Sequence, residues 1–150
     1  HALLTRDRSK QILTVSGELS ASVQSWSRRA SEDAWSRGWR LVDQTPSSSD
    51  ATAVPSAIVP GPDGQLLVAN RGVGTCGVLS GSLGHHKLID EFPLGGVQPR
   101  DVTSDGDQLW VAEQADGAVL CLHRSSEGWR QRLRLDLPGA SRVLIGPTLG

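Results

Sequence analysis

An internal repeat constrains the fold of this 150-residue chain more than any other feature. The segment PSAIVPGPDGQLLVANRGVGTCGVLS, from Pro55, matches PRDVTSDGDQLWVAEQADGAVLCLHRS, which begins 44 residues later at Pro99. Each copy has a short apolar run, an Asp-Gly pair, a second apolar run and a glycine-containing turn. Asp-Gly between apolar runs is typical of a tight β-hairpin, because such a turn needs positive φ, which glycine adopts freely. The repeat therefore predicts consecutive hairpins.

The apolar runs predict four strands in each copy. A more degenerate copy with the same order of runs precedes them, and a polar loop at 46–53 accounts for its greater length. For residues 28–37 of that copy we favour a charged hairpin loop over a helical turn. The strands expected by position are 11–15, 21–26 and 39–42 in the first copy, 66–69 and 88–89 in the second, and 109–112 and 133–137 in the third, with third strands through Cys76 and Cys121.

Four strands in 40–45 residues are typical of a β-propeller blade. The predicted fold is all-β, with blades at about 1–46, 55–96 and 99–138 and a closing strand at 141–146. Three blades cannot close a ring, since known propellers have at least ~4. We therefore expect the N-terminal blades of the same propeller to be missing from this chain. A β-sandwich or a three-sheet prism fits the number of strands but not the self-similarity.

Charge and cysteine content bear on the possible partners. Fifteen basic and sixteen acidic residues give a net charge of -1, so we expect neither nucleic acid nor a membrane surface as a partner. No apolar run approaches the ~20 residues of a membrane span. Cys76 and Cys121 have no zinc-type spacing and are expected to be small core residues. No metal and no cofactor are expected.

Short motifs at the strand ends resemble one family when they are taken in order. His1, Glu18-Leu19-Ser20, Asp63-Gly64 with Asn70-Arg71-Gly72, and Gly95 to Arg100 follow one another at blade spacing. This order resembles the C-terminal half of the seven-bladed lactonase family, which includes bacterial 6-phosphogluconolactonases and fungal carboxy-muconate cyclases. The similarity covers essentially the whole chain. The sequence departs from the family pattern at Gly17, where the family has Asn, and at Glu113, where it also has Asn.

The resemblance implies a site and an activity. It implies hydrolysis of a small anionic sugar lactone, 6-phosphogluconolactone first among them, in the cytoplasmic pentose phosphate pathway. A lactone-forming cyclase acting on a muconate is the alternative enzyme, and a non-catalytic binding platform is the alternative outside enzymes. The implied catalytic residues are His1, Glu18 and Arg71, and the implied substrate-binding residues are Asn70, Arg100 and Gln114.

The chemistry of lactone hydrolysis fits these residue types. The reaction needs a base that activates water and a group that stabilises the oxyanion. His1 and Glu18 form a pair able to take and return a proton. Arg71 and Arg100 can bind a phosphate or carboxylate bidentately. Glu18, Arg71 and Gln114 hold equivalent strand-end positions, so we expect them to face one ligand.

Each of these side chains also has a purely structural interpretation. Glu18 fits a solvated turn residue, and Arg71 and Arg100 fit ion pairs that tie neighbouring blades together. A histidine at the end of a chain is ordinarily of no functional interest. The motif order is what favours the functional interpretation.

Overall fold

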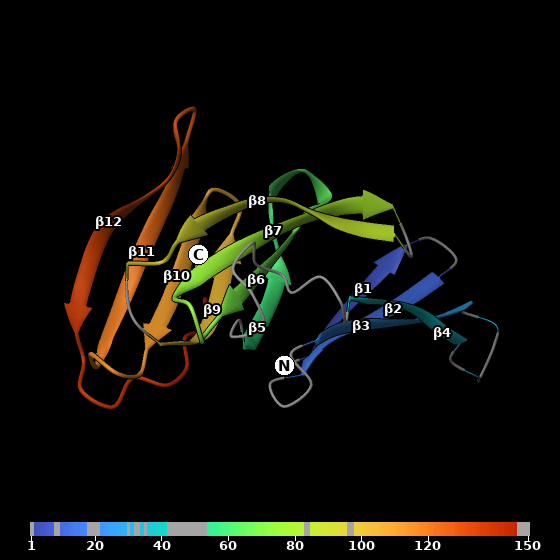
Figure 1. Ribbon diagram of the computed structural model, residues 1–150, viewed down its shortest axis with the longest axis horizontal. Coiled ribbons are helices and arrows are strands. Elements are labelled where there is room, and N and C mark those ends of the chain that lie inside the picture. The colour runs from blue at the N-terminus through green and yellow to red at the C-terminus, as the bar shows by residue number, and fades with distance from the viewer. Residues whose placement is uncertain are drawn as a thin grey trace.

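The computed structural model describes residues 2–7, 10–17, 22–29, 31, 34, 36–41, 54–82, 85–95 and 98–146, and gives side chains chiefly within 54–81, 86–95 and 98–146. The described elements are strands, apart from one three-residue 3-10 turn, η1 (Pro62–Gly64) (Figure 1). They form three separate four-stranded antiparallel sheets. The predicted all-β propeller-blade architecture is therefore confirmed.

Each sheet consists of four strands that are consecutive in the chain, which is the order of a propeller blade. Blade 1 contains β1 (Ala2–Asp7), β2 (Lys10–Gly17), β3 (Ser22–Arg29) and β4 (Ser36–Leu41). Blade 2 contains β5 (Pro55–Pro60), β6 (Leu66–Asn70), β7 (Thr75–Ser82) and β8 (His85–Pro93). Blade 3 contains β9 (Pro99–Asp105), β10 (Gln108–Glu113), β11 (Ala118–Ser125) and β12 (Gly128–Asp136).

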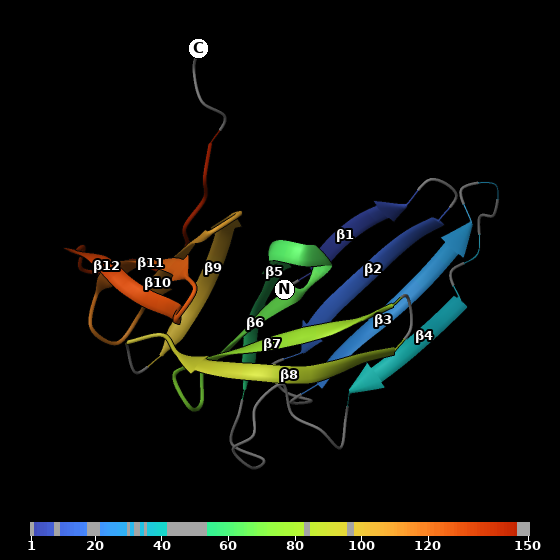
Figure 2. The ribbon, with the colours of Figure 1, turned by 90° about the horizontal axis from the view of Figure 1, so that it is seen from above.

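The three blades lie side by side and fan outward from their first strands. Seen from above, β1, β5 and β9 lie on one side of the array, while β4, β8 and β12 lie toward its outer rim (Figure 2). Neighbouring blades approach mainly through these first strands, because β5 contacts β9 on one side and β1 and β2 on the other. The first strands are therefore the innermost strands of their blades.

The turns follow the glycine pattern of the repeat. Asp63 and Gly64 have φ of 57° and 72°, and Gly106 has φ of 57°, so both Asp-Gly pairs use the left-handed region. Gly117 has φ of 60°, and a Cβ atom on it would come within 2.9 Å of Pro138 Cα. This backbone position excludes a side chain for steric as well as conformational reasons.

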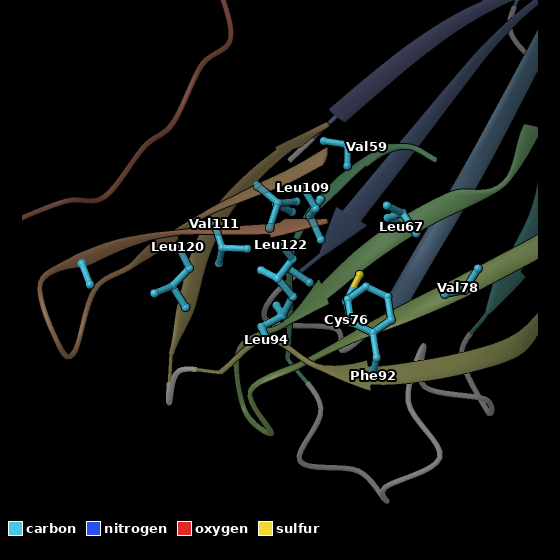
Figure 3. Close-up of a cluster of buried hydrophobic side chains, with 14 residues drawn as sticks. Val59, Leu67, Cys76, Val78, Phe92, Leu94, Leu109, Val111, Leu120 and Leu122 are labelled. Atoms are coloured by element: carbon cyan, nitrogen blue, oxygen red, sulfur yellow. The ribbon is translucent and has the colours of Figure 1, made fainter. Parts of the chain in front are cut away.

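The main hydrophobic core lies between blades 2 and 3. Side chains from the facing sides of the two sheets interdigitate there (Figure 3). Leu67 and Leu109 are fully buried, and the rings of Phe92 and Trp129 stack with centroids 5.5 Å apart. The opposite face of blade 2, on the side of blade 1, forms a smaller cluster of Ile58, Leu66, Val68 and Leu79. Packing between blades 2 and 3 thus contributes hydrophobic stabilisation.

Two details differ from the sequence predictions. Strand β3 extends to Arg29, so the hairpin loop before β4 is shorter than the expected 28–37. Residues 141–146 form no strand, although their apolar run predicted one. A strand requires hydrogen bonds to a neighbouring strand, whereas here the Val143 N–H donates to the Asp101 side chain at 3.1 Å.

Candidate functional site

The candidate site lies at the end of each blade where the first strand begins and the second strand ends. Arg71 follows the last residue of β6, and its N–H donates to the carbonyl of Val54, 2.7 Å away. Gln114 follows the last residue of β10, and its N–H donates to the carbonyl of Gln98, 3.3 Å away. Val54 and Gln98 both precede the proline that opens the innermost strand. The predicted equivalence of Arg71 and Gln114 is therefore confirmed.

A β-bulge marks this end in blades 2 and 3. In blade 3, Glu113 pairs with Pro99 while Ala112 pairs with Asp101, which leaves Arg100 as the extra residue. In blade 2, the same shift leaves Ser56 as the extra residue. Bulges bend a strand and re-aim its side chains, and they are frequent beside binding sites. Arg100 thus occupies a position where the regular alternation of the strand is interrupted.

A hydrogen bond joins the two bulges across the blade interface. The Ser56 hydroxyl donates to the carbonyl of Pro99 at 2.7 Å. At the far ends of the same strands, the Ser104 hydroxyl donates to the carbonyl of Pro60. Strands β5 and β9 therefore run side by side with like ends together. This places Arg71 and Arg100 at the same end of neighbouring blades, both half-buried.

Asn70 shapes the turn that carries Arg71. It is fully buried at the end of β6, and its carbonyl accepts a hydrogen bond from the N–H of Gly74 at 2.9 Å. Its side-chain amide donates to Thr75 Oγ1 at 3.4 Å. Thr75 in turn donates to Glu91 Oε1 at 2.5 Å. These contacts give Asn70 a structural part in the turn, while its predicted role in substrate binding stays a prediction.

Glu113 belongs to this end of blade 3 and was not among the predicted site residues. Its side chain is fully buried, which is unusual for a carboxylate. Glu113 Oε2 accepts a hydrogen bond from the Gln98 N–H at 3.0 Å. The available sequence signal was its departure from the family pattern, Glu where the family has Asn. That signal marks a difference without indicating burial.

An open cleft of about 470 Å³ runs along the innermost strand of blade 3. It is bounded by Val59, by β9 at residues 101–103, and by the C-terminal segment at residues 142–144. Asp101, the neighbour of Arg100 in sequence, stands in its wall and holds the C-terminal segment through Val143. The cleft offers one carboxylate and one guanidinium, from Arg142, beside aliphatic side chains.

Two predicted site residues, His1 and Glu18, lie outside the described residues, and β2 ends at Gly17, just before Glu18. Across the described residues, no cluster of three or more His, Cys, Asp or Glu has the arrangement of a metal site. Helices long and apolar enough to cross a membrane are likewise absent from the described part of the chain.

The two cysteines are placed as core residues. Cys76 and Cys121 are free and buried. Burial raises the pKa of both thiols above the ordinary 9.0, and the nearby Glu91 charge raises that of Cys76 further. Because the thiolate is the nucleophilic form, neither side chain suits covalent catalysis near neutral pH.

Comparison with known proteins identifies relatives at the level of family and fold. The sequence model of a family described as "Lactonase, 7-bladed beta-propeller" matches residues 1–143. No curated protein matches the sequence. A solved structure of a Lactobacillus plantarum protein superposes with a TM-score of 0.77 at 24% identity, over 95% of this chain and 43% of that one.

Two further solved structures have functional descriptions. A putative 6-phosphogluconolactonase from Bacteroides fragilis gives a TM-score of 0.74 at 15% identity, over 95% of this chain and 40% of that one. The periplasmic gluconolactonase of Pseudomonas aeruginosa gives a TM-score of 0.74 at 19% identity, over 94% of this chain and 40% of that one. At such identities the likeness concerns the fold. The chain spans about two fifths of the length of each of these structures.

Proposed function

Because the chain belongs to the seven-bladed β-propeller lactonase family, we propose that the protein hydrolyses a sugar lactone, and 6-phosphogluconolactone in particular. The observation that carries the proposal is the family match over residues 1–143. The placement of Arg71 and Arg100 at one end of neighbouring blades supports an anionic substrate, since a guanidinium binds phosphate or carboxylate bidentately. Action in the cytoplasmic pentose phosphate pathway is part of the same proposal.

The proposed reaction adds one water to the lactone. Glu18 removes a proton from water, and the resulting hydroxide attacks the lactone carbonyl. Arg71 stabilises the oxyanion of the tetrahedral intermediate, because a fixed cation favours charge that develops there. The bond from the carbonyl carbon to the ring oxygen then breaks, and His1 returns a proton to the departing oxygen. The product is the open-chain hydroxy acid. Asn70 and Gln114 hydrogen-bond hydroxyl groups of the sugar, and Arg100 binds its phosphate.

A lactonizing cyclase would use the same arginine pair differently. A muconate has carboxylates for Arg71 and Arg100 to bind. Its ring closes when a carboxylate oxygen adds to one carbon of a double bond and the neighbouring carbon takes a proton, so no water is consumed or released. The description of the matching family as a lactonase supports hydrolysis of a lactone over this reaction. A non-catalytic platform has no need of two arginines at the adjoining ends of two blades.

The test is a substrate panel with the full-length protein. Proton release in a pH-stat separates catalysed from spontaneous hydrolysis for 6-phosphogluconolactone and for unphosphorylated gluconolactone. Loss of the muconate absorbance measures cyclisation. We expect hydrolysis well above the spontaneous rate, with preference for the phosphorylated lactone. Cyclisation without hydrolysis supports the cyclase, and turnover of no substrate supports the platform.

A further inference from the structure

We propose that Glu113 is the positioning residue for Arg100: its buried carboxylate fixes the bulged segment Gln98-Pro99-Arg100 and thereby sets where the guanidinium meets an anion. This inference rests on the proposed function of Arg100 in binding the substrate's phosphate.

The first argument is the number of hydrogen bonds that hold the segment. Glu113 Oε2 accepts the Gln98 N–H at 3.0 Å, and the Gln98 carbonyl accepts the Gln114 N–H at 3.3 Å. The Pro99 carbonyl accepts the Ser56 hydroxyl of blade 2 at 2.7 Å. Two blades therefore hold the two residues directly before Arg100. The regular strand register is interrupted at the bulge. The position of the Arg100 side chain therefore depends on how firmly these hydrogen bonds hold the backbone before it.

The second argument is the chemistry of the acceptor. Proline has no N–H to give to the sheet, so Gln98 carries the last donor before the bulge. A carboxyl oxygen of Glu113 accepts this donor, and burial strengthens the hydrogen bond because the local dielectric is low. In blade 2 the residue at this position is Asn70, whose amide instead bonds Thr75 within its own turn. The longer glutamate side chain of blade 3 turns toward the innermost strand.

The third argument is burial. Glu113 is 0% exposed, whereas Arg100 is half-buried. A side chain without solvent contact does not meet a dissolved ligand directly. Glu113 therefore acts through the segment that it holds rather than as a group that touches the substrate.

The experiment compares Glu113→Ala with Glu113→Gln in the full-length protein, and Glu127→Ala is the matched control because that carboxylate is exposed on the β11–β12 turn. We expect Glu113→Ala to raise KM for 6-phosphogluconolactone about tenfold with a smaller change in kcat, since a small displacement of a binding group is costly. Glu113→Gln retains an acceptor oxygen and should restore most of the affinity. Glu127→Ala should leave KM unchanged.

A double-mutant cycle with Arg100→Ala identifies the route of the effect. If Glu113 acts through Arg100, adding Glu113→Ala to Arg100→Ala changes KM no further. If Glu113→Ala raises KM by the same factor in the original protein and in the Arg100→Ala variant, the proposal is overturned. So does a Glu113→Ala protein that melts at a lower temperature but keeps the original KM, because that describes a merely structural residue.

An activity-independent readout separates this proposal from the proposed function. Hydrogen exchange of the Gln98 amide should be at least tenfold faster in Glu113→Ala than in the original protein, and near the original rate in Glu113→Gln. Calorimetry with inorganic phosphate should show weaker binding in Glu113→Ala, but not in Glu113→Gln or Glu127→Ala. If the original protein hydrolyses no lactone, the proposed function fails while these two measurements still decide the role of Glu113. Unchanged exchange and unchanged phosphate binding would refute that role.

Discussion

The hydroxyl of Ser56 lies 2.7 Å from the carbonyl oxygen of Pro99, 43 residues further along the chain and in the next blade. Ser56 and Arg100 are the two bulged residues of their innermost strands, so this bond aligns two equivalent irregularities. It brings the end of blade 2 that carries Arg71 against the end of blade 3 that carries Arg100. The relative position of the two arginines is thus set by the blade interface as well as by each blade.

Removing this hydrogen bond should destabilise the interface. Ser56→Ala leaves the Pro99 carbonyl without the Ser56 donor in a buried setting, and we expect the free energy of unfolding to fall by about 1–3 kcal/mol. Ser126→Ala, on the exposed β11–β12 turn, is the control and should change stability by less than about 0.5 kcal/mol. Urea unfolding followed by tryptophan fluorescence measures both. Equal midpoints for the two variants would contradict the structural role of the bond.

The proposed general base gives a prediction about turnover. In the full-length protein, Glu18→Gln removes a proton acceptor while retaining the size of the side chain. We expect kcat for the lactone to fall by about 10²–10⁴-fold, with KM changed far less. Steady-state pH-stat kinetics make the measurement. Hydrolysis at the original rate by this variant would exclude Glu18 as the base.

The buried thiols predict an alkaline limit to stability. Burial raises the pKa of Cys76 and Cys121 above the ordinary 9.0. A raised pKa in the folded state means that the unfolded chain loses these protons first. The contribution of the protonated thiols to the free energy of unfolding is therefore constant below pH 9 and is lost as the pH rises further. Urea midpoints measured between pH 7 and 10.5 should fall above pH 9, and iodoacetamide should label neither thiol in folded protein at pH 8. Rapid labelling of the folded protein would show that these sites open.

The far face of blade 3 predicts self-association of residues 1–150. Leu133 and Leu135 are 41% and 42% exposed there, and Leu135 stands where blade 2 has Phe92, which is buried against blade 3. An apolar sheet face of this kind favours association. Light scattering should show oligomers that Leu135→Lys diminishes, while Ser126→Lys, on the exposed turn, does not. A stable monomer of the unmodified chain would contradict this expectation.

The repeat made the fold predictable because each blade repeats one set of local signals. Asp63-Gly64 and Asp105-Gly106 mark hairpins, and the apolar runs at 66–69 and 109–112 mark buried strands. The equivalence of Arg71 and Gln114 followed from the same alignment. All these features depend on residues that are close in sequence.

Features that depend on partners distant in sequence were not predictable in this way. Arg100 is the bulged residue because Pro99 pairs with Glu113 while Asp101 pairs with Ala112. The sequence around Arg100 does not indicate this pairing. Glu113 at a strand end resembles a solvated turn residue, yet in the fold it is fully buried. The apolar run at 141–146 favoured a strand, but strand formation depends on a neighbour that the run itself does not specify.

The most direct test of the account is the ratio of kcat/KM for 6-phosphogluconolactone to that for unphosphorylated gluconolactone. It should be measured in the full-length protein and in its Arg71→Ala and Arg100→Ala variants. If Arg100 binds the substrate's phosphate and Arg71 stabilises the oxyanion, the original protein prefers the phosphorylated lactone by a factor of about 10² or more. Arg100→Ala should then lose most of this preference, mainly through KM, whereas Arg71→Ala should lower kcat/KM for both lactones and keep the preference. An original protein without such preference, or an Arg100→Ala variant that retains it in full, would contradict the assignment of this blade end as the anion-binding site.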